Sequence, residues 1–151
     1  MRDSMGGVVT LAIIVVFIVL ASGYMAFNVN YTKAFKMKNK IISIYEEYDG
    51  DCSSSECQDK IKDYAHSIGY SVRNLNCSSF SGFDVGGEIE SSQNLFCKQT
   101  VTAKVSTDGS KKYYYHKIVT KINIDIPVIN NMLNLNALYL SGDTKTFVSE
   151  N

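Results

Sequence analysis

The sequence predicts an α+β protein, in which a long N-terminal membrane-spanning α-helix packs on an antiparallel sheet of about four strands. Three observations support this fold. No charged residue lies between Asp3 and Lys33, a helical apolar spacing follows that stretch, and the spacing changes to a period of two from Leu95 onward. The chain has 151 residues, 45% of them apolar and 20% charged, which fits one ordered domain. Its 15 basic and 15 acidic residues balance, so we expect no nucleic-acid partner.

Residues 8–29 form the predicted transmembrane helix. These 22 residues would extend over roughly 33 Å as a helix, which matches a hydrocarbon core of about 30 Å. The alternative is a cleaved secretory signal, with Arg2 as its positive region and the small residues 21–23 at its cleavage site. The apolar pattern continues beyond Gly23 as far as Val29, which favours the membrane helix.

Residues 30–48 are predicted to continue the same helix in amphipathic form. Apolar residues recur there at spacings of three and four: Ala34, Met37, Ile41, Ile44 and Tyr48. Because no Gly or Pro occurs in residues 24–48, we expect one helix over residues 8–48. Residues 1–7 would then be a short cytoplasmic leader, and residues 49–151 an exported α+β domain.

The orientation of the chain rests on two conflicting signals. Four lysines follow the apolar segment, namely Lys33, Lys36, Lys38 and Lys40, and the positive-inside rule would place them in the cytoplasm. That rule weakens for translocated domains longer than roughly 60 residues. The cysteines favour the opposite orientation, so we expect the C-terminal domain to be extracellular.

The four cysteines, Cys52, Cys57, Cys77 and Cys97, contain no C-x-x-C pair, so a zinc site is a poor fit. Disulfides fit better, and four cysteines allow three connectivities. We favour Cys52 with Cys57 and Cys77 with Cys97, because each pair then closes a polar loop. Both bonds require an oxidising compartment, which supports export.

The exported domain is predicted to begin with a short helix. Ser55 is its expected N-cap and Gly69 ends it. A short strand is expected over residues 70–75. Residues 78–94 are rich in Gly and Ser and lack a period, so we expect a surface loop pinned by Cys77 and Cys97.

The sheet is predicted from alternating apolar residues. A hairpin joins a strand that starts at Leu95 to a second strand through a turn at residues 107–110. In the second strand, one face should be buried and the other wet. The residues expected on the buried face are Ile118, Thr120, Ile122, Ile124 and Ile126, and those expected on the wet face are Val119, Lys121, Asn123 and Asp125. Pro127 should end this strand, a third strand is expected over residues 133–139, and a turn at residues 141–143 should lead to an edge strand over residues 146–148.

No arrangement of residues predicts an enzyme, a cofactor or a metal site. His66 and His116 have no compelling partner, and the Gly86-Gly87 pair is not followed by a helix that could bind phosphate. The tyrosines at 113–115, flanked by lysines, are better explained by strand packing than by nucleic-acid stacking.

The long half-apolar N-terminal helix, the sheet and the disulfide-closed loop together resemble the type IV pilins and pseudopilins. Within that superfamily, the start MRDSMGG and the stretch IDIPVINNMLNLNALYLSGDTKTF are most similar to the tight-adherence (Tad) pseudopilins of the TadE-like type. The resemblance implies a prepilin leader that ends at Gly6 or Gly7. The Glu that usually occupies the fifth mature position is replaced by Leu11 or Ala12. This departure fits a minor subunit or an unprocessed membrane protein better than a major pilin.

The resemblance implies a structural subunit of a bacterial envelope filament or of its assembly machinery, in an adhesion, secretion or DNA-uptake system. Its expected partners are membrane lipid, other pilin-like subunits through the N-terminal helix, and the pilus assembly machinery. The alternative is a single-pass membrane-anchored or secreted binding domain that does not polymerise. In either case the loop between Cys77 and Cys97 is the expected contact surface.

Charge along the helix suggests how neighbouring subunits could be aligned. A basic band comprises Lys33, Lys36, Lys38 and Lys40, and an acidic band that includes Glu46 and Glu47 follows it. We hypothesise that the basic band of one subunit faces the acidic band of a staggered neighbour. The alternative is that the lysines lie on lipid headgroups and the acids face solvent.

Overall fold

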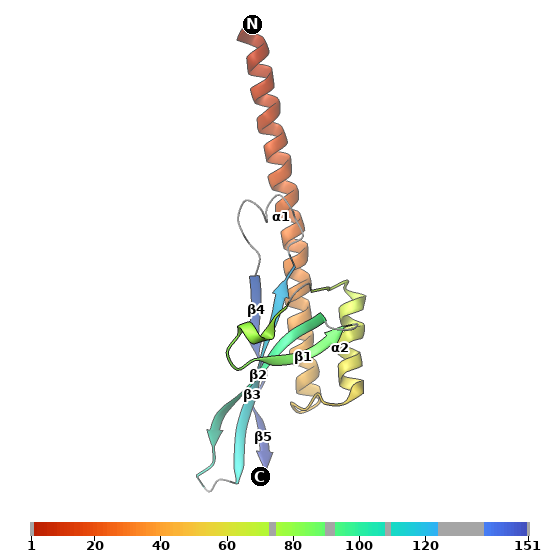
Figure 1. Ribbon diagram of the computed structural model, residues 1–151, viewed down its shortest axis with the longest axis vertical. Helices are drawn as coiled ribbons and strands as arrows, with labels where there is room; N and C mark the ends of the chain where they lie inside the picture. The colour runs from red at the N-terminus through yellow and green to blue at the C-terminus, as the bar shows by residue number, and fades with distance from the viewer. Residues whose placement is uncertain (1, 73–74, 90–92, 108–109, 124–137, 151) are drawn as a thin grey trace.

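The computed structural model describes residues 2–72, 75–89, 93–107, 110–123 and 138–150. These ranges contain an α+β domain attached to one long helix (Figure 1). The elements are α1 (Arg2–Glu47), α2 (Ser55–Ser67), the short 3-10 helix η1 (Cys77–Ser79), β1 (Asp84–Ile89), β2 (Gln93–Val105), β3 (Lys111–Ile122), β4 (Leu138–Asp143) and β5 (Phe147–Glu150). The second half of α1 packs on the sheet beside α2, whereas the first half extends away from the domain (Figure 1).

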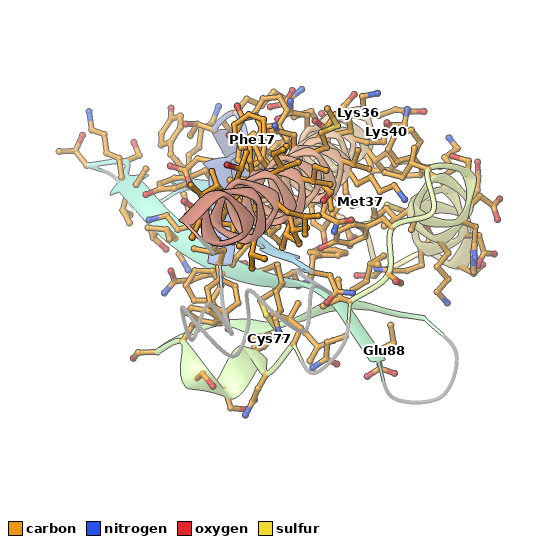
Figure 2. The ribbon with its side chains drawn as sticks, turned by 90° about the horizontal axis from the view of Figure 1, so that it is seen from above. Phe17, Lys36, Met37, Lys40, Cys77 and Glu88 are labelled. Carbon is orange, nitrogen blue, oxygen red and sulfur yellow. A yellow bond between two sulfur atoms is a disulfide. The ribbon has the colours of Figure 1, made fainter. Side chains whose placement is uncertain are left out.

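The predicted apolar stripe of α1 is the centre of the core. Ala34, Met37, Ile41 and Ile44 are fully buried, and Tyr45, which the spacing did not predict, is buried beside them. Viewed along α1, Met37 lies toward the interior, whereas Lys36 and Lys40 lie on the side away from the sheet (Figure 2). The apolar stripe also makes a polar contact with β3, since the buried Thr120 hydroxyl donates to the Ala34 carbonyl at 3.4 Å.

The turn after α1 depends on Gly50. The Gly50 N–H donates to the Tyr45 carbonyl at 2.8 Å, and Gly50 has a φ of 87°, a conformation that favours glycine. A Cβ at this position would lie 2.8 Å from the Phe147 ring of β5, so a larger residue would not fit. The helix therefore ends one residue before the predicted Tyr48.

Helix α2 has the predicted end but a different N-cap. Ser54, not Ser55, is the N-cap, because its hydroxyl accepts from the Cys57 N–H at 3.3 Å. Gln58 instead donates its side-chain amide to the Cys52 carbonyl at 2.8 Å. Gly69, with a φ of 60°, follows the helix as expected.

The segment between α2 and β1 corrects two predictions. Residues 70–72 and 75–76 are not a strand, although Tyr70, Val72 and Leu75 are buried as the alternation suggested. The backbone of this segment bonds outside any strand ladder: the Tyr70 N–H donates to the Ala65 carbonyl at 2.8 Å, and the Asn94 side-chain amide donates to the Leu75 carbonyl at 2.8 Å. The predicted loop at residues 78–94 contains most of η1, the whole of β1 and the first two residues of β2.

The sheet is antiparallel with the order β1-β2-β3-β4, and β5 also pairs with β3. The β2–β3 hairpin was predicted. Strand β1 exists because Gly86 and Gly87 leave room for the Phe96 ring of β2, at two irregularities in the register. This packing is the role that the structure gives to the Gly86-Gly87 pair.

The predicted turn at residues 141–143 was wrong. Ser141, Gly142 and Asp143 pair with β3 as the end of β4. The chain does not reverse afterwards, because β4 and β5 follow one another along the same edge of β3. Gly142 allows close packing there, since a Cβ would lie 2.9 Å from Ile42 Cδ1, the end of an α1 side chain that would have to shift. Of the predicted third strand, residues 133–137 lie outside the described residues.

The burial of β3 is confirmed on one face and corrected on the other. Ile118, Thr120 and Ile122 are buried as predicted, but Val119, expected on the wet face, is also buried. The segment around η1 covers that second face: Cys77 lies on the opposite side of the sheet from α1 (Figure 2), and it is bonded to Cys97, which pairs with Val119. Ile124, Ile126, Asp125 and Pro127 lie outside the described residues.

Candidate functional site

The first half of α1 is an exposed apolar surface. Its large apolar side chains are exposed on all sides of the helix, from Val8 to Leu20, with Phe17 72% exposed. Within residues 7–47 one stretch is long and apolar enough to cross a membrane, judged by length and composition. The Ser22 hydroxyl is satisfied inside the helix, by bonds to the Ile18 and Val19 carbonyls. This surface has no covering element among the described residues.

The two candidate leader glycines, Gly6 and Gly7, both lie within α1, which begins at Arg2. A Cβ at Gly7 would have nothing within 4 Å. Cleavage at either glycine stays a prediction.

The four lysines of the basic band lie at the base of the exposed segment and differ in their contacts. Lys33 Nζ donates to the Gly69 carbonyl at the end of α2, at 3.1 Å. Lys38 Nζ lies 4.7 Å from the centroid of the Phe35 ring, and Lys40 Nζ lies 5.9 Å from that of Tyr64. Lys36 is exposed and has no hydrogen bond or ion pair within the described ranges. It is therefore the lysine of the band most available to an outside partner.

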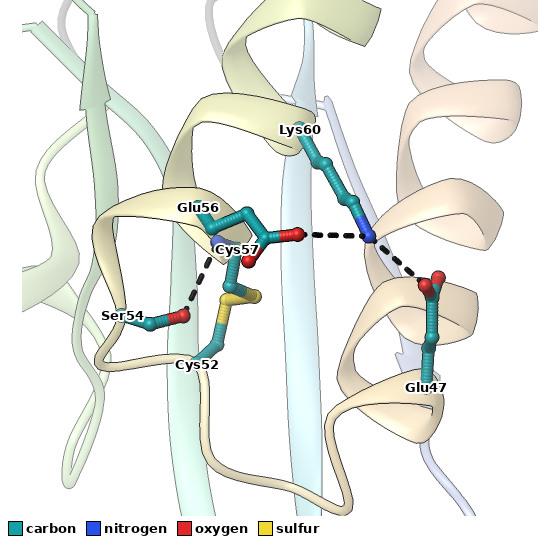
Figure 3. A network of polar contacts seen from close by, with 6 residues as sticks. All are labelled: Glu47, Cys52, Ser54, Glu56, Cys57 and Lys60. Atoms are coloured by element: carbon teal, nitrogen blue, oxygen red, sulfur yellow. Dashed lines mark hydrogen bonds and ion pairs between the residues drawn. A yellow bond between two sulfur atoms is a disulfide. The ribbon is translucent and has the colours of Figure 1, made fainter.

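Both acidic residues of the proposed register contact have partners in their own chain. Glu46 Oε1 accepts from the Lys145 backbone N–H at 2.7 Å, and Lys145 Nζ donates to the Glu46 carbonyl at 3.1 Å. Glu47 forms an ion pair with Lys60 at 3.0 Å, and Lys60 also lies 3.7 Å from Glu56 (Figure 3). No local pattern in the sequence identifies Lys60 or Lys145, which become neighbours of the acids only through the fold.

The disulfides have the favoured connectivity. Cys52 is bonded to Cys57 at the start of α2 (Figure 3), and Cys77 is bonded to Cys97, which joins η1 to β2. All four cysteines are buried. The chain between Cys77 and Cys97 is therefore held against the sheet at its ends, and its exposed residues include Asp84, Val85 and Glu88.

His116 has a structural position in the core. Its Nε2 lies 2.8 Å from the Gly50 carbonyl oxygen, which can only accept, so Nε2 carries the proton. Nδ1 then accepts from the Thr100 hydroxyl at 3.0 Å. Burial lowers the pKa of His116, the Lys98 charge lowers it further, and the Gly50 hydrogen bond opposes both. The neutral imidazole thus connects β3 to the turn after α1, packed among the rings of Tyr45, Tyr114 and Phe147.

We expect His116 to make the domain less stable in mild acid. Its ordinary pKa is 6.5 and its folded pKa is lower, so between these values the unfolded chain binds more protons. The contribution is complete above about pH 6.5 and is lost as the pH falls through the folded pKa. His116→Gln should cost about 1 kcal/mol at neutral pH and flatten this dependence. Urea denaturation of the native chain and the variant, from about pH 8 to about pH 5, measures the pH dependence of the free energy of unfolding.

His66→Gln is the matched control, because His66 is exposed on α2. It should keep the pH dependence of the native chain. If His116→Gln keeps the same dependence as well, the buried imidazole is not its source.

The described part of the chain contains no group of three or more His, Cys, Asp or Glu residues that could hold a metal ion. Asp51, in the acidic loop after α1, accepts from the Ser53 hydroxyl at 2.6 Å, and this hydrogen bond lowers the pKa of the carboxyl. Comparison with protein-family models, curated proteins and solved structures finds no match to this chain.

Proposed function

We propose that this chain is a pilin-like structural subunit of a bacterial envelope filament, or of the machinery that assembles one, similar to the Tad pseudopilins. It would cross the membrane once, with its C-terminal domain outside the cell. One observation carries the proposal: α1 is continuous from Arg2 to Glu47, yet only its second half is covered by the domain. The helix therefore connects an apolar surface rigidly to a folded domain.

The physical basis of assembly is the all-round apolar surface of residues 8–20. A helix of this kind is stable in lipid, and it can leave lipid only by packing against equally apolar helices. Membrane would then store the subunits, and neighbouring helices would form the core of the filament. The two buried disulfides support an exported domain, because such bonds persist in oxidising compartments.

Within this proposal, charge sets the axial register between neighbouring subunits. Lys36 is the donor best placed to reach a neighbour, because it lacks an ion pair among the described residues. Glu46 and Glu47 would have to exchange their contacts with Lys145 and Lys60 to accept it. For the exposed Glu47–Lys60 ion pair such an exchange costs little, whereas Glu46 would also have to release the Lys145 backbone N–H.

Photo-crosslinking through the exposed apolar surface tests the function. We expect a benzophenone amino acid in place of Phe17 to give a ladder of crosslinked species above the 16.8 kDa chain, formed with copies of itself or with other pilin-like subunits, when it is irradiated in cells of the native host. The reason is that a filament core brings α1 helices into side-by-side contact. Immunoblotting of the irradiated cells measures the ladder.

The same benzophenone at Asp63, which is exposed on α2 outside the Cys77–Cys97 segment, is the matched control and should give no such ladder. Monomer alone at both positions would contradict a filament subunit. It would favour the membrane-anchored or secreted binding domain that does not polymerise.

A further inference from the structure

A groove lies where the exposed half of α1 meets the domain. It has a volume of about 440 Å³ and is formed by one side of α1 and the end of α2. Its lining residues are Asn28, Val29, Thr32, Lys33, Lys36 and Ile68. Ile68 lies more than thirty residues beyond Lys36 in the chain, so the groove is a product of the fold.

The groove is amphipathic in a definite order along α1. Val29 lies at the end of the apolar segment, and Ile68 contributes a second apolar wall from α2. Lys33 and Lys36 lie one and two turns further on and bring two positive charges. Lys33 is held in place by its bond to the Gly69 carbonyl, while Lys36 keeps its ammonium free of partners in the described chain.

Aromatic side chains mark the same level of the helix. The rings of Phe27 and Tyr31 lie 6.2 Å apart, and those of Tyr31 and Phe35 lie 6.3 Å apart, as a row along α1. Tyr31 and Phe35 are partly exposed. Tyrosine, here Tyr31, is enriched where a membrane helix passes the headgroup region, because its ring is apolar and its hydroxyl is polar. The groove is therefore at headgroup depth if residues 8–29 span the membrane.

We propose that this groove binds the headgroup of an anionic phospholipid. The Lys36 ammonium donates to a phosphate oxygen, Lys33 adds its charge from the inner wall, and the upper acyl chain lies against Val29 and the apolar surface that continues from it. The inference rests on the proposed membrane anchoring, and it gives that anchor a lipid preference. It also assigns Lys36 a role before assembly, while the subunit is stored in the membrane.

The test uses the full chain, reconstituted in phosphatidylcholine vesicles with a trace of spin-labelled phosphatidylglycerol or spin-labelled phosphatidylcholine. Electron paramagnetic resonance measures how much of each labelled lipid is immobilised by the protein. We expect the native chain to prefer phosphatidylglycerol, and Lys36→Gln to lower that preference roughly fivefold, the effect of one lysine near an anionic lipid surface. Lys36→Arg should retain most of the preference.

Lys40→Gln is the matched control, because it removes the same charge from the same helix at a lysine that lies over Tyr64 outside the groove. It should leave the preference unchanged, and so should inorganic phosphate added to the buffer. If Lys36→Gln and Lys40→Gln lower the preference for phosphatidylglycerol equally, general positive charge explains it and the specific site is wrong. If added inorganic phosphate lowers the preference, the ligand is free phosphate and not the lipid. Flotation of the vesicles tests the membrane anchor separately. If the chain floats with the vesicles but shows no lipid preference, the headgroup site is wrong and the membrane anchor stands. If the chain does not float, both the site and the anchor are wrong.

Discussion

Replacing both Cys77 and Cys97 by alanine is expected to lower the free energy of unfolding by about 3 kcal/mol. The bond between them closes a segment with a sequence separation of 20, so it strongly restricts the unfolded chain. Both sulfurs are buried, and the bond holds η1 over the second face of the sheet. Urea denaturation of the full chain in detergent micelles measures the loss. Tyrosine fluorescence is a suitable probe, because the chain has ten Tyr and no Trp.

Cys52→Ala with Cys57→Ala is the matched control, because it removes a second buried disulfide by the same chemical change. Its sequence separation is only 5, and the smaller loop entropy predicts a loss of about 2 kcal/mol. If the Cys77/Cys97 variant is as stable as the native chain, the disulfide does not form in the cell. An oxidising compartment, and with it the extracellular orientation, would then lose its support.

Local patterns were sufficient to predict the helices. The apolar stripe of Ala34, Met37, Ile41 and Ile44 follows from spacing alone, because residues three and four apart share a face of any helix. Tyr45 was not predicted, because the spacing of three and four continues from Ile44 to Tyr48. In the fold its ring lies edge-on to Phe96, and burial raises the pKa of the phenol to about 12.

The sheet was less predictable where side-chain packing overrides turn signals. Gly86 and Gly87 suggested a loop, but they form a strand because the Phe96 ring occupies the space that a side chain would need. Ser141-Gly142-Asp143 has the composition of a turn, yet it pairs with β3, and Gly142 lets the Ile42 side chain of α1 pack closely against β4. In both cases the reason for the glycine lies on another element, which a local pattern cannot reveal.

The candidate site was predicted in its parts but not in its arrangement. The exposed apolar helix and the basic band follow from composition, and the disulfide pairing follows from loop closure. The contact between Glu46 and Lys145 joins residues 99 positions apart, and the groove beside Lys36 needs Ile68 from α2. Neither has a sequence signal, because each is set by how α1 packs against distant elements.

Two charged residues at the centre of the exposed half of α1 should prevent this segment from inserting into the membrane. Val15 and Val19 are one turn apart, and both are exposed. Each lysine at the centre of a transmembrane helix costs about 3 kcal/mol on insertion scales, so Val15→Lys with Val19→Lys should weaken insertion by about 6 kcal/mol. Lysine is a good helix former, so the helix itself should persist. Flotation of cell membranes and extraction with alkaline carbonate measure the bound fraction.

The comparison that gives this experiment its meaning is Asn39→Lys with Ser43→Lys. These positions are also one turn apart on α1 and exposed, but they lie beside the folded domain, so the same two charges should leave membrane binding unchanged. If both double variants stay bound, the protein is held by something other than residues 8–29, and the single-pass anchor is wrong. If only the Val15/Val19 variant is released and its domain remains folded and disulfide-bonded, the apolar half of α1 is the anchor. Phe17 lies between the two substituted positions. The proposed helix–helix contact at Phe17 would then form between subunits that start out anchored in the membrane.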